Sequence, residues 1–213
     1  LELGYGNFQT FKGNAYISGP IADGVSADLA LTGLGMGDGY GQNRANGEDV
    51  RRVYHDIGIR SKWKFELGPD TEARLIFDYA DAKNNTFVAG VRKGTTIAPP
   101  FGPQINSDYD ISQDVQPIIN VRSGGASLRI DQALGDIKLV SISAYRDLKY
   151  SQPFDGDYTA VRATEILVKE HDKQFSQEFQ LLSPSNQAFQ WVLGGYYSLS
   201  DSGYGPLALS FFG

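Results

Sequence analysis

The sequence contains no cysteine and no surplus of basic side chains. Without cysteine there can be no disulfide framework, no thiolate metal site and no cysteine nucleophile. The chain carries 19 Lys and Arg against 25 Asp and Glu, a net charge of −6. Nucleic-acid binding needs a concentrated basic face, so we expect no nucleic-acid partner.

Long apolar runs are also missing. No stretch reaches the roughly 20 mostly apolar residues that a membrane-spanning helix needs. Leu1 is not followed by the basic start and apolar run of a signal peptide, and we expect a mature segment or a fragment. A helical membrane protein is excluded. A membrane β-barrel is not, because its strands are apolar only at every second position.

Glycine and aromatic residues are abundant, with 25 Gly, 12 Tyr and 12 Phe. Glycine disfavours helices, at about 1 kcal/mol per interior position, whereas aromatic residues suit strands. The clearest segment alternates with period two, and a strand would gather its charges on one face. Its apolar positions are Ile57, Ile59, Trp63, Phe65 and Leu67, and its charged positions are Arg60, Lys62, Lys64 and Glu66.

The same period predicts eight antiparallel strands, many about as long as a tilted membrane strand must be. In the sixth, we place Val140, Ile142 and Ala144 on the apolar face; in the last, Phe189, Trp191 and Leu193. The predicted strands are 2–18, 24–36, 56–67, 73–82, 118–131, 137–147, 172–183 and 189–200.

The predicted connections alternate between short and long. Short, Gly- and Pro-rich turns fall at 19–24, 68–72, 132–136 and 183–188, and long loops at 37–56, 83–116 and 147–171. An outer-membrane barrel has this rhythm, with short periplasmic turns and long extracellular loops. Aromatic residues beside the short turns are typical of a membrane-interface girdle.

These patterns predict an all-β fold, an antiparallel transmembrane β-barrel segment of about eight strands. Its apolar side chains should face lipid and its basic side chains a wet lumen. We expect Trp63, Phe65, Leu75, Phe77, Leu128 and Trp191 to point outward, and Arg60, Lys62, Arg74 and Arg129 inward. A soluble β-sandwich that binds carbohydrate and a self-contained eight-stranded barrel stay open as alternatives.

Several short motifs stand in the order and spacing of one known family. They include Tyr5-Gly-Asn-Phe8, Gly13-Asn-Ala-Tyr-Ile-Ser-Gly-Pro20, Ile59-Arg-Ser-Lys-Trp-Lys-Phe65, Ser141-Ile-Ser-Ala-Tyr-Arg-Asp147, Phe175-Ser-Gln-Glu-Phe-Gln-Leu-Leu-Ser-Pro184 and Trp191-Val-Leu-Gly-Gly-Tyr-Tyr197. Over nearly all of residues 1–200 the chain resembles the barrel of TonB-dependent outer-membrane receptors. The resemblance implies that residues 1–213 are about strands two to nine of a 22-stranded barrel, without the plug domain.

The resemblance also implies a function, active import of a scarce nutrient across the Gram-negative outer membrane. In that family the ligand is most often a ferric siderophore, and less often cobalamin or a saccharide, and we expect the same order for this chain. The expected partners are outer-membrane lipid and lipopolysaccharide, the small-molecule ligand, and the TonB complex, which would act through the plug segment.

The sequence shows no catalytic constellation, and we expect neither an enzyme nor a bound cofactor or metal. His55 and His171 are assigned to separate long loops as solvated side chains. Long loops without regular structure are often functional. For ligand contact we select four residues of the predicted extracellular loops: Tyr40, Arg92, Phe101 and Tyr109.

Overall fold

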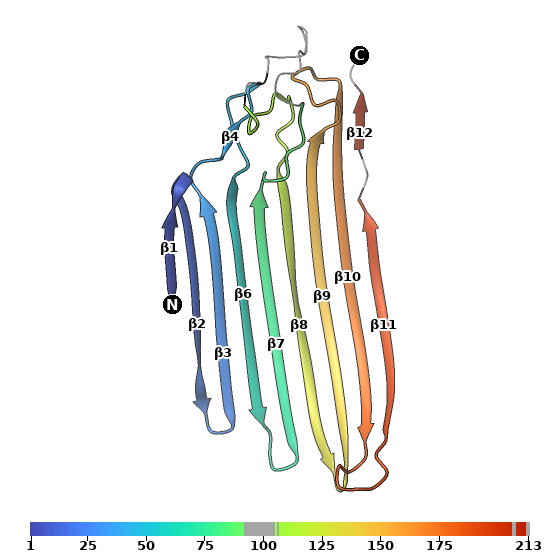
Figure 1. Ribbon diagram of the computed structural model, residues 1–213. Coiled ribbons are helices and arrows are strands. Elements are labelled where there is room, and N and C mark those ends of the chain that lie inside the picture. Colours follow the sequence, from blue (N-terminus) through green and yellow to red (C-terminus); the bar gives the residue numbers. More distant parts are fainter. Residues whose placement is uncertain (92–104, 106, 206–207, 212–213) are drawn as a thin grey trace.

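The computed structural model describes residues 1–91, 105, 107–205 and 208–211, which fold almost wholly as β-structure. Figure 1 shows the long strands side by side. They are β2 (Thr10–Ala22), β3 (Val25–Met36), β6 (Val53–Glu66), β7 (Thr71–Asn84), β8 (Ile119–Leu134), β9 (Ile137–Asp155), β10 (Thr164–Leu182) and β11 (Val192–Tyr204). The short elements are β1 (Glu2–Gly6), a 3-10 turn (Asn7–Gln9), β4 (Gly41–Gln42), β5 (Asp49–Val50) and β12 (Ala208–Phe211).

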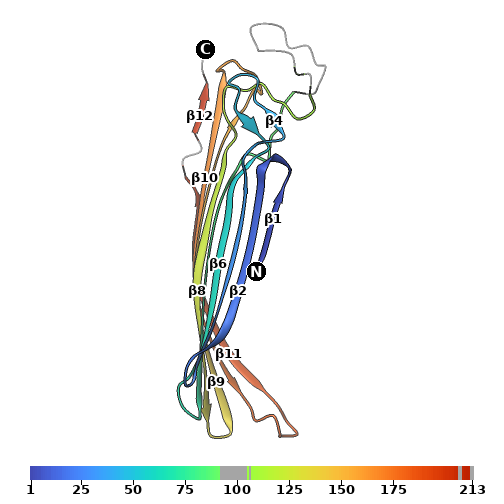
Figure 2. The same cartoon turned by 90° about the vertical axis from the view of Figure 1, so that its left-hand side faces the viewer.

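The long strands form one antiparallel sheet in which sequence neighbours are also spatial neighbours. The order is β1-β2-β3-β6-β7-β8-β9-β10-β11, with β12 paired to the far end of β10. Figure 2 shows this sheet edge-on as a single bent layer. Among the described residues, no backbone pairing joins β1 to β11, so the sheet is open. None of the described helical segments is long and apolar enough to span a membrane.

The alternation of short and long connections is confirmed. Turns at one end of the sheet are made by residues 23–24, 67–70, 135–136 and 183–191. Loops at the other end are made by 37–52, 156–163 and the described residues of 85–118. The third loop is much shorter than predicted. β9 and β10 pair continuously out to Asp155 and Glu165, where polar side chains on both faces hide the strand period.

One face of the sheet is free of charge across a broad band. Directly paired residues share a face, and Trp63 pairs with Leu75, which pairs with Leu128. From Ile59 to Phe65 this face of β6 spans about 20 Å, most of the ~25 Å apolar band of a membrane barrel. We call it the apolar band. On the neighbouring strands it includes Ala27, Leu29, Leu31, Ala73, Phe77, Tyr79, Ala126, Ile130, Ser141, Ser143, Tyr145, Phe175, Gln177 and Phe179.

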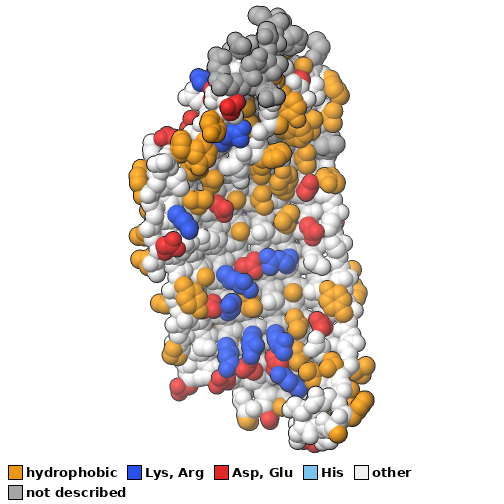
Figure 3. All heavy atoms as spheres, in the orientation of Figure 1, with side chains coloured by type: hydrophobic (Ala, Val, Ile, Leu, Met, Phe, Trp, Pro, Cys, Tyr) orange, Lys and Arg blue, Asp and Glu red, His pale blue; other side chains and the backbone are white. Residues whose placement is uncertain are grey.

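The opposite face carries ion pairs at the same heights, seen as blue and red side chains in the lower half of Figure 3. Three of the six pairs join neighbouring strands, two lie within one strand, and one crosses an intervening strand. Solvent-exposed ion pairs contribute little individually. The pairs are Lys62–Asp28, Lys64–Glu72, Arg74–Glu72, Arg129–Asp131, Lys138–Asp131 and Arg146–Asp78. The predicted opposition of Trp63, Phe65, Leu75, Phe77 and Leu128 to Arg60, Lys62, Arg74 and Arg129 holds in the strand register.

Three details of the prediction are wrong. The segment 2–18 is not one strand: β1 turns back on β2 through the 3-10 turn, where Phe8 and Gln9 adopt φ of 59° and 51°. The sixth strand has the opposite phase, since Ile142 pairs with Arg129 and Ser143 with Leu128. Trp191 precedes β11 in the turn, where its N–H donates to the Ser183 hydroxyl.

The most completely buried side chains lie mainly in the loops and not on the sheet. Val50, Ile105, Ile111, Asn43, Asn85 and Gln113 are all buried at the long-loop end. A one-layer sheet cannot bury either face by itself. The loop end is therefore the part of the described chain that is packed like a domain core.

Candidate functional site

The three long connections form one packed assembly at the end of the sheet opposite the short turns. We call it the loop assembly; it comprises the described residues of 37–52, 85–118 and 156–163. Its most deeply buried apolar side chains are Val50, Ile105 and Ile111, each at most 3% exposed. Buried polar side chains must be hydrogen-bonded to be tolerated, and most of them are.

Asn43 links the first loop to the second. Its side-chain amide donates to the Gln113 carbonyl at 2.9 Å and to Gln116 Oε1 at 3.1 Å, and its Oδ1 accepts from the Gln113 N–H at 3.0 Å. Asn43 is fully buried and Gln113 nearly so. Next to them, the Arg44 guanidinium donates to Asp110 Oδ2 at 2.6 and 2.8 Å. The loops are thus joined by directional contacts and not by apolar packing alone.

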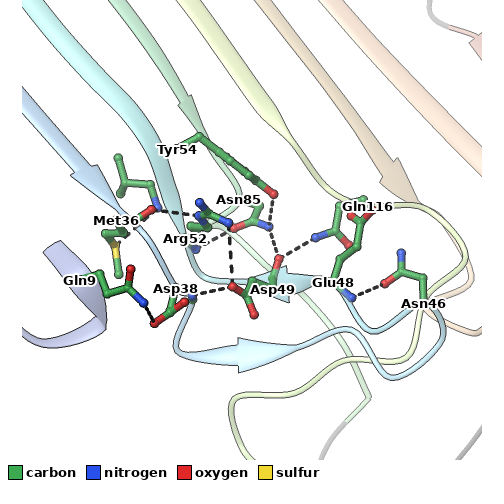
Figure 4. Close-up of polar contacts among 12 residues, drawn as sticks. Gln9, Met36, Asp38, Asn46, Glu48, Asp49, Arg52, Tyr54, Asn85 and Gln116 are labelled. Atoms are coloured by element: carbon green, nitrogen blue, oxygen red, sulfur yellow. Dashed lines mark hydrogen bonds and ion pairs between the residues drawn. The ribbon is translucent and has the colours of Figure 1, made fainter.

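Asn85 anchors the assembly to the top of the sheet (Figure 4). Its Oδ1 accepts from the Arg52 N–H at 2.7 Å, and its amide donates to the Asp49 carbonyl at 2.7 Å and to the Tyr54 hydroxyl at 3.3 Å. Gln116 donates to the same Asp49 carbonyl at 2.8 Å. Arg52 also lies over the Tyr54 ring, 5.0 Å from its centroid. The base of both loops is therefore held in one arrangement.

Two of the four predicted ligand-contact residues lie in the described part of the assembly, and both are exposed. Tyr40 is 49% exposed and makes an edge-to-face contact with Phe8, with ring centroids 4.3 Å apart. Tyr109 is 60% exposed, and its backbone abuts Gly41, where a Cβ would lie 2.1 Å from the Tyr109 carbonyl oxygen. The fold therefore brings the two tyrosine-bearing segments together. Arg92 and Phe101 lie outside the described residues.

A small cavity opens beneath the second and third loops. Its volume is about 150 Å³, and Phe87, Phe154 and Tyr158 contribute aromatic rings to a lining that also contains Gln113 and Asp155. Such a cavity accommodates a single ring or a short side chain. The Asp155 carboxyl, only 1% exposed, gives it one strongly polar group.

Asp155 faces a second carboxyl group, that of Asp114. Asp155 Oδ1 accepts from the N–H groups of Asp157 and Tyr158, each at 2.8 Å. Asp155 Oδ2 and Asp114 Oδ1 are buried without a hydrogen-bond donor among the described residues. Burial raises the pKa of Asp155 to about 7 and also raises the pKa of Asp114. Two such carboxyls at close range are expected to share one proton.

Sequence reasoning missed these buried polar residues because no periodic pattern marks them. Asp155-Gly-Asp157 is a typical turn sequence, and that is the only signal the chain offers there. The two histidines were assigned to loops, which is wrong. His55 lies in β6, 3.2 Å from Asp81, and His171 in β10, 3.6 Å from Asp201. Within the described ranges, no group of three or more potential metal ligands is found.

Comparison with known proteins gives the fold and no family. No protein-family model and no curated protein sequence matches the chain. Among solved structures, it is similar to the ferric yersiniabactin uptake receptor FyuA from Yersinia pestis, with a TM-score of 0.66 and 17% sequence identity. The match covers 93% of this chain and 30% of that receptor, so the chain spans under a third of the receptor's length. The chain therefore has the fold of a β-barrel segment of the kind found in that receptor.

Proposed function

We propose that this chain is an arc of the barrel of an outer-membrane receptor that imports a scarce nutrient with energy from the TonB complex. The observation that carries the proposal is the difference between the two faces of one sheet. The apolar band is uncharged across six neighbouring strands, while the opposite face of those strands is lined with ion pairs. Lipid on one side and water on the other is the environment that suits both faces.

The open edges favour an arc over a complete small barrel. The outer edges of β1 and β11 carry backbone N–H and C=O groups with no strand beside them among the described residues. Unpaired strand edges are not tolerated within lipid, so further strands must continue the sheet on both sides. A soluble sandwich would need a second sheet over the apolar band. The only other sheet in the described chain is the two-stranded β4–β5 ribbon of the loop assembly.

The loop assembly is where the ligand would bind, and we propose a ferric siderophore as its class. The support is the barrel-level likeness to a siderophore receptor and the exposed Tyr40 and Tyr109 on a rigid base. Aromatic side chains give large contact areas at low entropic cost, which suits recognition of a bulky ligand.

The test is performed on cells that carry the whole gene. The protein should fractionate with the outer membrane, migrate differently on gels before and after boiling, and support uptake of radioactive iron from a siderophore only when TonB is functional. Replacement of Tyr40 and Tyr109 by alanine should weaken ligand binding. The control Tyr204→Ala, at a more exposed tyrosine at the end of β11, should not. A protein found in the soluble fraction, or uptake that persists without TonB, would refute the proposal.

A further inference from the structure

A groove lies on the same face as the apolar band, just beyond its outer end. It has a volume of about 470 Å³, and its lining includes Arg122, Lys149, Lys169 and His171. These four basic residues come from the three adjacent strands β8, β9 and β10. Among the residues that line the groove, Glu170 is the one acid, and it pairs with Tyr150 on the opposite face.

Three of the four basic side chains stand in one row. Arg122 pairs directly with Lys149, and Lys149 pairs directly with His171. Cβ atoms of directly paired residues are only about 5 Å apart, and like charges so placed destabilise a sheet. A row of this kind is expected where an anion from outside the chain supplies the compensating charge.

In this row, Arg122 and His171 at the two ends lie beside carboxylates of the chain, whereas Lys149 in the middle forms no ion pair among the described residues. Arg122 donates to Asp81 at 2.9 Å, and His171 lies 3.6 Å from Asp201. Lys149 and Lys169 are exposed and have no carboxylate partner within the part of the chain that the structure describes. On β11, opposite His171, stands Gly203, where even a Cβ would lie 3.2 Å from the His171 ring. The groove is thus kept open beside the two unpaired ammonium groups.

The height of the row on the sheet identifies the anion. On β7 and β8 the row lies two residues, about 7 Å, beyond Tyr79 and Gly124, the last uncharged positions of this face. On β9 and β10 the directly paired Asp147 and Lys173 stand between the row and the apolar band. The headgroup layer extends some 5–7 Å beyond each side of the hydrocarbon core. Side chains at this height on the lipid-facing surface therefore meet the headgroups of lipids that border the barrel.

We propose that Arg122, Lys149, Lys169 and His171 form a binding site for the phosphate groups of a phosphorylated lipid in the outer leaflet. Ammonium and guanidinium groups bind phosphate through charge-assisted hydrogen bonds, and the apolar band below the site receives the acyl chains of the same molecule. The inference rests on the proposed outer-membrane location, but it is independent of which nutrient is imported.

The test uses the whole protein, purified from outer membranes in detergent, and two probes: bis-phosphorylated lipid A and the same lipid after enzymatic removal of both phosphates. The wild type should retain the phosphorylated lipid at least about tenfold better, and an excess of inorganic phosphate should not displace it. The double variant Lys149→Gln/Lys169→Gln should lose most of this preference, and Lys149→Arg/Lys169→Arg should keep it. The control Lys12→Gln/Lys62→Gln removes two lysines from the opposite face and should bind as the wild type does.

Equal retention of both lipids by the wild type, or an unchanged preference in the glutamine variant, would overturn the site. Displacement by inorganic phosphate alone would overturn the lipid assignment. Gel migration before and after boiling shows that each variant is folded. A folded protein that imports its nutrient with TonB but shows no lipid preference would refute this site and leave the proposed function intact. A lipid preference without TonB-dependent uptake would support this site and refute the proposed function.

Discussion

The Arg146 guanidinium binds both carboxylate oxygens of Asp78 across an intervening strand, at 3.0 and 2.8 Å. Asp78 is on β7 and Arg146 on β9, and the residue between them on β8 is Gly125. A Cβ on Gly125 would lie 2.4 Å from the Tyr145 carbonyl oxygen and 3.1 Å from Arg146 Cγ. The glycine therefore leaves room for an ion pair that spans three strands.

Replacement of Gly125 by alanine should lower the free energy of unfolding by about 1–3 kcal/mol, because the added methyl group meets backbone that cannot give way. Urea titration of the protein refolded in lipid vesicles measures the change. Gly33→Ala on β3 is the matched control, since a Cβ there meets nothing within 4 Å. Equal stability of the two variants would show that the close approach at Gly125 has no energetic consequence.

Leu128 gives a direct test of which face meets lipid. It lies in the apolar band between Leu75 and Ser143. Leu128→Arg should cost about 2–4 kcal/mol of unfolding free energy if the residue lies near the bilayer midplane. The same denaturant titration in vesicles measures the cost. Ser127→Arg, one residue away on the opposite face, should cost much less. A silent Leu128→Arg together with a costly Ser127→Arg would reverse the assignment of the two faces.

The strand period predicted the sheet well because alternate side chains of a strand point to opposite faces of the sheet. It could not predict the phase of β9, where Val140 and Ile142 lie on the charged face and Ser143 lies on the apolar face. There Ser143 and Gln177 face the apolar side and satisfy each other by a hydrogen bond, which no single-strand pattern reveals. The fold-back at Phe8 was hidden because apolar residues alternate on both sides of the turn. The loop assembly was missed since Asn43, Asn85 and Gln113 form contacts between segments 24 to 73 residues apart.

Asn43 should be essential to the loop assembly and dispensable for the sheet. Asn43→Ala removes the bonds to Gln113 and Gln116 and leaves the buried Gln113 N–H unpaired, at about 1–3 kcal/mol. Hydrogen exchange followed by mass spectrometry should show faster exchange in 37–52 and 107–118, with the strands unchanged. Asn46→Ala removes one bond, to the Glu48 N–H, at an exposed position and serves as control. Equal protection in both variants would contradict a structural role for Asn43.

The carboxyl pair of Asp114 and Asp155 should make the loop assembly sensitive to pH. Asp155 lies beyond the apolar band, and burial raises its pKa from 3.8 to about 7. The folded state therefore keeps a proton that the unfolded loop has already released between about pH 4 and pH 7. A group that is protonated only in the folded state stabilises less as pH rises through this window. After correction for the pH dependence of the intrinsic exchange rate, the protection of residues 107–118 against hydrogen exchange should thus fall from pH 5 to pH 8.

Asp155→Asn should abolish this dependence and stabilise the loops at pH 8. The asparagine keeps an oxygen for the N–H groups of Asp157 and Tyr158 and gains an amide donor for Asp114 Oδ1. Because the amide is neutral at every pH, the stability of the folded loop no longer depends on the protonation of residue 155. Asp108→Asn, at an exposed position of the same loop, should keep the wild-type slope. If protection in the Asp155 variant still fell with rising pH, the sensitivity would have to come from another group of the assembly.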